Sequence, residues 1–533
     1  MFNFQNILQL PSEILGEILS YVPNQIVLGQ VCRKFYTTSC SLKACELQLN
    51  LNFDDKEDDS YIELENDEVY DSIIRSHRKI KSLRVEFTCP SKPPKNLCSR
   101  LVAIIDRYGE NIIKATFIEF AITKRSFTLL NLMPNLQKLH FYDLRIAYSQ
   151  NPDKLRLRLN FLSELDFNTG DLSSLEVISL LPDDVLRKLK IAFCAGEYDI
   201  RKNFIEKQTK LVEIETNCCC LDLTNIKLKK FSISPNNHRI IEETFKNQDE
   251  MTSLKMYICN NFEEIMNWIC SNLIALEQFE FSARLNFNLV NLRKLKNLRK
   301  LKIYNITGED LNTLKSESLQ TLELCQLPEE SLKNVAIHCP NLRELCFTGT
   351  LNQSAKLDKI LQNLPKIERI FCSYTLFIKN KFQCCGHPNL KSLSVRDSNI
   401  YPRYWDSLFD FISRCQNFES LSININLKSK QLKNLLSMNP RLKSLCLGEI
   451  SEDSFKIVKK YGKNLHCLHY TGWSKKHNKM RVSKLKEYFE DQFTLFAFRG
   501  APDAHEEGLM RRTGSEEKCC KLWPMDQKKE RRD

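Results

Sequence analysis

The 533-residue sequence predicts an α/β solenoid with parallel strands inside and helices outside, preceded by a small all-α module. The main observation is the motif apolar-x-x-apolar-x-apolar, which recurs about every 24 residues from residue 80 onward. The second is a helical apolar pattern within residues 1–45. The third is an acidic run, residues 54–59, between the two patterns. Together they divide the chain into a module, a linker and one long repeat domain.

The N-terminal module has the pattern of two or three short helices. Positions 14, 15, 18, 19 and 22 place apolar side chains on one helical face, which Pro11 opens and Pro23 ends. A second apolar set has the same spacing and consists of Leu28, Val31, Cys32, Phe35 and Tyr36. A unit this small cannot bury a large core alone. It therefore either packs on the repeats or keeps an apolar face for a partner.

Residues 46–75 are predicted to be an acidic linker. Such dense charge is typical of a solvated, flexible segment. Residues 1–75 carry a net charge of −8 and the remainder of the chain carries +20. The formal charge of +12 is therefore the difference between an acidic front and a basic remainder.

The repeat is predicted to fill residues 76–493. Clear copies of the motif start at Leu136, Leu298, Leu319, Leu342, Leu390 and Leu442, and weaker ones at Ile80, Ile112, Leu162, Leu186, Leu211, Leu228, Met251, Leu276, Ile367, Phe418 and Leu465. Many intervals then show helical spacing, which predicts a strand, a turn and a helix in each unit. Apolar spacing from Val482 to Phe493 predicts a terminal capping helix. Residues 494–533 lose the pattern and are predicted to be a disordered tail.

With this period the repeat region resembles the leucine-rich repeat family, which implies a horseshoe. Cysteines at recurring places make it similar to the cysteine-containing subtype. Cys194 and Cys259 lie two residues beyond a strand motif, whereas Cys339 and Cys415 lie three residues before the next one.

The N-terminal module resembles an F-box, although that family commonly has Trp where Phe35 stands. The resemblance implies docking on the Skp adaptor, and through it on a cullin, by the positions Leu10, Pro11, Ile14, Leu15, Ile18, Leu19, Val31, Cys32 and Phe35. F-box proteins with leucine-rich repeats are substrate-recognition subunits of SCF (Skp–Cullin–F-box) ubiquitin ligases, which direct protein substrates to the proteasome. The alternatives are an interaction scaffold outside ubiquitination, in which the module only caps the repeats, and a small-ligand receptor with a cofactor in the solenoid.

Catalytic, metal and membrane signals are weak. No phosphate loop, zincin or nucleophile-elbow motif occurs, and no cysteine pair has C-x-x-C spacing. These absences agree with the F-box resemblance, which implies a non-catalytic receptor subunit. We expect no cofactor and no metal. No apolar stretch approaches the ~18 residues of a membrane span, and the N-terminus lacks the features of a signal peptide. We therefore expect the protein to be located in the cytoplasm or the nucleus.

The exposed positions of the strands predict where a partner binds. The third, fifth, seventh and eighth motif positions carry 11 basic and 12 acidic residues, so the face is close to neutral and no nucleic-acid partner is expected. From Cys346 onward the fifth position is uncharged. We predict a substrate-binding region there, with Phe371, Tyr374, Arg396 and His469 as candidate contacts. The alternative is that the neutral positions reflect drift and no such localisation exists.

Overall fold

The computed structural model describes the chain in segments and divides it into two compact units, Met1–Asn261 and Phe262–Asp533. The described residues are 45–53, 62–63, 67–76, 79–88, 99–119, 121–122, 129–143, 145–146, 157–168, 178, 180–192, 198–217, 221–233, 245–257, 262–282, 288–304, 306–324, 331–347, 361–372, 386–395, 405–423, 427–450, 452–473, 495–498 and 510–511. The adaptor-binding positions of the predicted F-box all lie outside these segments.

The first unit is built on parallel strands that pair in chain order. They are β1 (Cys45–Phe53), β3 (Ile80–Thr88), β4 (Lys114–Ile118), β6 (Lys138–Tyr142), β8 (Glu164–Asn168), β9 (Lys188–Ala192), β10 (Glu213–Thr216), β11 (Lys230–Ile233) and β12 (Ser253–Tyr257). The short β2 (Ile62–Glu63) runs antiparallel to β1, and β5 (Ala121–Ile122) pairs separately with β7 (Arg145–Ile146). Its helices are α5 (Asp67–Arg75), α6 (Ser99–Tyr108), η1 (Gly109–Asn111) and α9 (Tyr198–Glu206).

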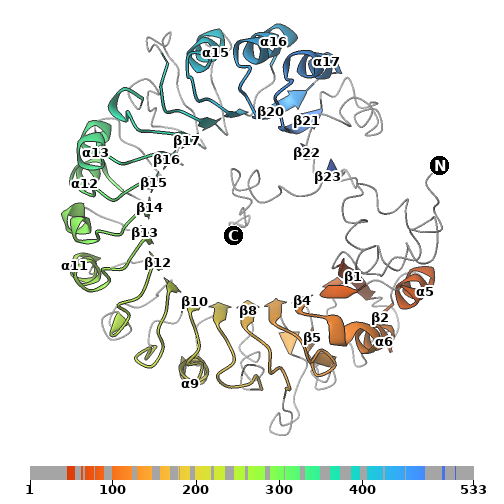
Figure 1. Cartoon of the computed structure of the whole chain (residues 1–533). Coiled ribbons are helices and arrows are strands. Elements are labelled where there is room, and N and C mark those ends of the chain that lie inside the picture. The colour runs from red at the N-terminus through yellow and green to blue at the C-terminus, as the bar shows by residue number, and fades with distance from the viewer. Residues whose placement is uncertain are drawn as a thin grey trace, which may run out of the picture. The chain divides into compact units, whose positions relative to one another are not determined.

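The second unit repeats this arrangement, with strands along one side and helices along the other (Figure 1). Its parallel strands are β13 (Gln278–Ser282), β14 (Lys300–Tyr304), β15 (Thr321–Leu324), β16 (Glu344–Phe347), β17 (Arg369–Cys372), β18 (Ser392–Val395), β19 (Ser420–Ile423), β20 (Ser444–Ile450), β21 (Cys467–Trp473) and β22 (Leu495–Phe498). The last strand, β23 (Met510–Arg511), is antiparallel to β22. The helical segments are α11 (Phe262–Asn272), η4 (Leu289–Lys294), α12 (Gly308–Asn312), α13 (Leu332–His338), α15 (Trp405–Ser413), α16 (Ser429–Met438) and α17 (Glu452–Tyr461).

The repeat motif builds the core of both units, as predicted. Each of the seventeen predicted motif starts is at most 4% exposed, and a strand starts two residues later in every copy except the first, where β3 begins at Ile80 itself. Equivalent positions pair across strands, as Leu301 does with Leu322, and Leu322 with Leu345. Because side chains alternate along a strand, the fourth and sixth positions enter the core and the fifth faces outward. The solenoid architecture is therefore confirmed within each unit.

A polar contact in each turn ties one repeat to the one before it. An asparagine precedes several motifs, and its side-chain amide donates to a carbonyl of the preceding repeat, as Asn135 does to Glu110 at 2.8 Å and Asn389 to Pro365 at 2.9 Å. At the third residue before several motifs, a buried side chain forms hydrogen bonds with nearby backbone groups. These side chains include Gln208, Gln248, His387, Cys415 and Asn439. Such contacts satisfy backbone groups that a tight turn would leave unpaired.

Two of the four cysteines behind the predicted subtype can be located. Cys339 is 1% exposed and Cys415 is 5% exposed, each at the third residue before its motif. Cys194 and Cys259 lie outside the described residues.

The sheet extends beyond both ends of the range predicted for the repeats. Strand β1 and helix α5 fall within residues 46–75, which we expected to form a linker, and β22 and β23 fall within the expected tail. Leu47 of β1 pairs with Leu83, and Phe496 of β22 pairs with Leu468, both as fourth motif positions. The acidic run 54–59 and the expected capping helix, residues 482–493, lie outside the described residues.

Candidate functional site

The outward strand face of the first unit is covered by ion pairs between neighbouring strands. Lys138 pairs with Glu164 at 2.8 Å, and Lys190 pairs with Glu215 at 3.1 Å. Strands β9 and β10 also carry the pair Lys188–Glu213, at 3.4 Å. Opposite charges that face each other across strands stabilise the sheet and neutralise each other. This part of the face therefore offers little unbalanced charge to a partner.

Within this face, His140 and its neighbours form a compact polar cluster. His140 is paired in register with Asp166, and its Nε2 lies 3.6 Å from Glu164. Tyr142 donates a hydrogen bond of 2.8 Å to Asp166. Burial lowers the pKa of His140 against the opposing effect of Asp166, so the neutral imidazole is favoured.

The second unit has the same kind of ion pairs from β13 to β17. Lys300 Nζ lies 2.6 Å from Glu323, and Lys302 lies between Glu280 and Glu323 at 3.8 and 3.7 Å. Arg369 reaches Glu344 at 3.9 Å. Burial alone would lower the pKa of Lys300, but the bond to Glu323 raises it above its usual value.

From β16 onward the fifth motif positions of the face change in character. The fifth motif positions form one continuous row in register: Cys346, Phe371, Ser394, Ser422, Cys446 and His469. Phe371 is half-buried, whereas Ser394 and Cys446 are each 8% exposed. Neighbouring strands lie ~4.8 Å apart, so Phe371 and His469 are separated by about 19 Å along this row. The neutral row is therefore long enough to contact an extended polypeptide.

The structure locates part of the predicted substrate-contact set. Phe371 and His469 lie at equivalent positions of β17 and β21, on the same row. Tyr374 and Arg396 lie outside the described residues.

The edge of the sheet carries a second row of charge that sequence reasoning overlooked. It consists of the second motif positions, where each backbone N–H donates to the carbonyl of the preceding member at 2.7–2.8 Å: Glu277, Arg299, Gln320, Arg343, Glu368, Lys391, Glu419 and Lys443. Lys391 pairs with Glu368 at 2.8 Å, and Lys443 with Glu419 at 2.7 Å. The bond from Lys391 lowers the pKa of Glu368. The sequence does contain a signal for this row, namely the charge of the residue at the second position of successive motifs.

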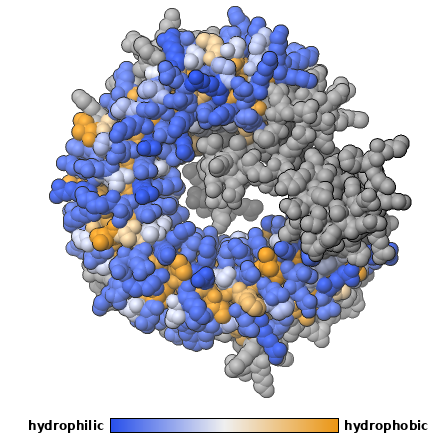
Figure 2. Space-filling view, viewed as in Figure 1, coloured by the Kyte–Doolittle hydropathy of each residue, from blue (hydrophilic) through white to orange (hydrophobic). Residues whose placement is uncertain are grey.

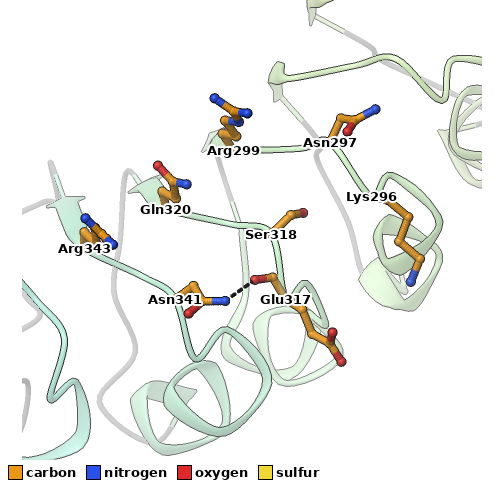
Figure 3. A pocket seen from close by; sticks show the side chains of 8 residues that line it. All are labelled: Lys296, Asn297, Arg299, Glu317, Ser318, Gln320, Asn341 and Arg343. Atoms are coloured by element: carbon orange, nitrogen blue, oxygen red, sulfur yellow. Dashed lines mark hydrogen bonds between the residues drawn. The ribbon is translucent and has the colours of Figure 1, made fainter.

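A pocket of about 260 Å³ opens at this edge (Figure 3). Its lining includes Lys296, Arg299, Glu317, Ser318, Gln320 and Arg343. The side chains of Arg299, Gln320 and Arg343 extend to one side of the ribbon, whereas those of Lys296 and Glu317 extend to the other. The carbonyl oxygen of Glu317 accepts a hydrogen bond from Asn341 at 2.8 Å.

Exposed bases also gather on the outer helices of the second unit. Helices α16 and α17 and the residues next to them carry exposed lysines at 428, 430, 433, 456, 459, 460 and 463. The ammonium groups of Lys433 and Lys460 each lie 5.5 Å from the ring centre of Tyr461. These lysines stand on or next to helices rather than on the strand face.

The surface of the described residues is mainly hydrophilic in the view of Figure 2, with small separate hydrophobic groups. The most exposed large hydrophobic side chains of the described segments, Phe161, Ile274 and Ile337, belong to different repeats. In these segments no group of three His, Cys, Asp or Glu side chains could hold a metal ion, and no helix is long and apolar enough to cross a membrane.

Comparison with known proteins identifies the N-terminal module. Residues 7–46 match the F-box domain family. No curated protein matches the chain. Together with the parallel sheets described above, this match shows an F-box domain followed by a leucine-rich-repeat-like solenoid.

Similar solved structures are remote in sequence. An internalin from Listeria monocytogenes is 13% identical over 70% of this chain and 83% of its own, with a TM-score of 0.24. A leucine-rich repeat protein of Leptospira interrogans is 14% identical over 77% and 98%, with a TM-score of 0.31. TLR13 in complex with ssRNA13 is 13% identical over 79% and 70%, with a TM-score of 0.34.

Proposed function

We propose that the protein is the substrate-recognition subunit of an SCF ubiquitin ligase. The observation that carries the proposal is the match of residues 7–46 to the F-box domain, which runs directly into a repeat sheet whose first strand begins at Cys45. An F-box implies binding to the Skp adaptor, and through the adaptor to a cullin. The buried Cys339 and Cys415 support placing the repeats in the cysteine-containing subtype. A location in the cytoplasm or the nucleus fits this role.

In this role the protein is a receptor and performs no chemistry itself. The F-box places the chain on the ligase, and the repeats hold a protein substrate near the ubiquitin donor carried by other subunits. Holding the reactants together raises their effective concentration, which is how such an assembly accelerates transfer. Burial raises the pKa of Cys270 to about 12 and disfavours its thiolate, which fits a core side chain rather than a nucleophile.

We assign the substrate to the neutral row between β17 and β21. Elsewhere on the described strand face many charged side chains already have partners, such as Lys300 with Glu323. A substrate that docked there would have to displace these ion pairs. The neutral row carries a half-buried aromatic, Phe371, beside small side chains such as Ser394 and Ser422. An aromatic anchor with small neighbours can accept an apolar side chain of a partner.

The test is capture of the adaptor by the full chain. Each fully buried leucine contributes about 2 kcal/mol to an interface, so Leu15→Asp with Leu19→Asp should abolish co-purification of the adaptor and cullin. The matched control is Ser12→Asp with Ser20→Asp, which adds the same charge off the apolar face of the predicted helix and should retain both. Adaptor capture by the leucine double variant would overturn the assignment. Captured proteins without any adaptor or cullin would indicate the scaffold instead.

A further inference from the structure

The charges of the edge row alternate in sign with a single interruption. From β13 to β20 the second motif positions read Glu277, Arg299, Gln320, Arg343, Glu368, Lys391, Glu419 and Lys443. Every basic member from Arg343 onward pairs with an acidic neighbour, as Arg343 does with Glu368 at 3.4 Å. Only at Gln320 does a neutral amide stand where the alternation would place a carboxylate. Two arginines flank that amide.

The pocket of about 260 Å³ lies at this interruption. Backbone bonds of 2.8 Å join Gln320 to Arg299 and Arg343 to Gln320, which holds the three residues side by side. Adjacent strands are ~4.8 Å apart, so the two arginine backbones stand about 10 Å from each other. Guanidinium groups on side chains of this length can converge on a group placed over Gln320.

Positive charge in this pocket is only partly balanced by the protein. Within the described segments, Arg299 and Lys296 take part in no ion pair, and Arg343 shares Glu368 with Lys391. The acidic side chain of the lining, that of Glu317, extends away from Gln320 (Figure 3). A negative group over Gln320 would therefore restore the alternation of the row.

We propose that this pocket binds one oxyanion, a carboxylate or a phosphate group, carried by a polypeptide that contacts the repeats. Arginine presents a planar fork of N–H donors that matches the oxygens of either group. The amide of Gln320 adds a neutral donor between the two forks. The proposal rests on the proposed function in one respect, since it takes that polypeptide to be the substrate. It assigns the substrate an acidic or phosphorylated residue next to the segment on the neutral row.

The experiment measures thermal unfolding of the full chain with three peptides, Gly-Ser-Gly-X-Gly-Ser-Gly, in which X is serine, phosphoserine or glutamate. Inorganic phosphate at matched ionic strength is a fourth probe. Ligands that bind only the folded state raise the midpoint, and for units of this size we expect a rise of about 2 °C at saturating millimolar concentrations. The serine peptide should give no rise, and whichever charged peptide stabilises the chain identifies the source of the oxyanion.

The decisive variant is Gln320→Glu, which supplies the missing charge from the protein itself and should remove the response to every probe. Gln278→Glu adds the same charge at an exposed position of β13 and should keep the full response. Equal responses of the wild type and Gln320→Glu would overturn the proposal, as would a response to free phosphate alone. Adaptor capture by Gln320→Glu should be unchanged, so failure of the pocket and failure of the ligase assignment are separate results.

Discussion

The side-chain nitrogen of Gln248 lies 2.7 Å from the carbonyl oxygen of Ile226, and Gln248 is only 2% exposed. The same nitrogen lies 3.0 Å from the carbonyl of Leu223, and the side-chain oxygen accepts the N–H of Leu228 at 2.9 Å. One amide thus satisfies three backbone groups of the preceding turn. The carbonyl of Leu223 also accepts the N–H of Ile226, so loss of the amide would leave the Leu228 N–H and the Ile226 carbonyl buried without this partner, which is costly.

Gln248→Leu should therefore destabilise the first unit by about 2–4 kcal/mol, although leucine is the more apolar side chain. The measurement is native-state hydrogen exchange, in which amides of β11 and β12 should lose protection first. Gln278→Leu changes an exposed glutamine of β13 in the same way and should have little effect. Similar losses of stability in both variants would show that the buried hydrogen bonds of Gln248 do not stabilise the fold.

His387 occupies the same place in its repeat as Gln248 does, at the third residue before the motif. It should make the stability of the protein depend on pH. Its Nε2 lies 3.2 Å from the carbonyl oxygen of Leu364, and burial lowers its pKa below the usual 6.5. The folded state favours the neutral ring, so the unfolded chain binds more protons below pH 6.5. Stability is then complete above that pH and falls on acidification.

Urea midpoints at pH 7.5 and pH 5 test this directly. His387→Gln keeps a side chain that Gln208 and Gln248 use at the equivalent position, but it removes the titration. The wild type should lose more stability on acidification than this variant does. The contribution of His140, whose pKa is also lowered, is common to both proteins and cancels. An identical loss in both proteins would refute the role of His387.

The sequence predicts the core well because the motif is local. Burial of the fourth and sixth positions follows from the geometry of one strand, the first position lies just before that strand, and all seventeen starts lie in the core. The strand before them escaped notice because its first motif position is Ala44, and the strand after them because Phe493 also fits a helical pattern. The pocket at Gln320 depends on which second positions stacking brings side by side. Intervals between motifs vary, so no single copy contains that information.

Reversing one charge on the strand face should show how much the cross-strand ion pairs contribute to stability. Glu323→Lys removes the partner of Lys300 and Lys302 and places three like charges together. We expect a loss of about 1 kcal/mol at low ionic strength, with most of it recovered in 0.5 M salt. Glu317→Lys makes the same change on a turn and should cost little. A loss for Glu323→Lys that salt does not reduce would point to packing instead.

The buried cysteines should resist alkylation in the folded protein. Burial raises the pKa of both Cys270 and Cys339 to about 12, so almost no thiolate is present at pH 8. Iodoacetamide followed by peptide mass spectrometry should leave both residues unmodified in buffer and modify both in 6 M urea. Rapid labelling of either residue in buffer would contradict its burial.

The neutral row makes the most direct prediction about the substrate. Phe371→Ala with Arg396→Glu should reduce substrate capture at least about tenfold, because removing an aromatic anchor and reversing the charge of a second predicted contact together exceed the ~1.4 kcal/mol that a factor of ten requires. Adaptor binding through the F-box should not change. Tyr257→Ala, an aromatic truncation on β12 where the strand face is charged, is the matched control and should capture the wild-type set of proteins. If the double variant captures the same proteins in the same amounts, the uncharged positions from β17 to β21 reflect drift, and the substrate binds elsewhere on the repeats.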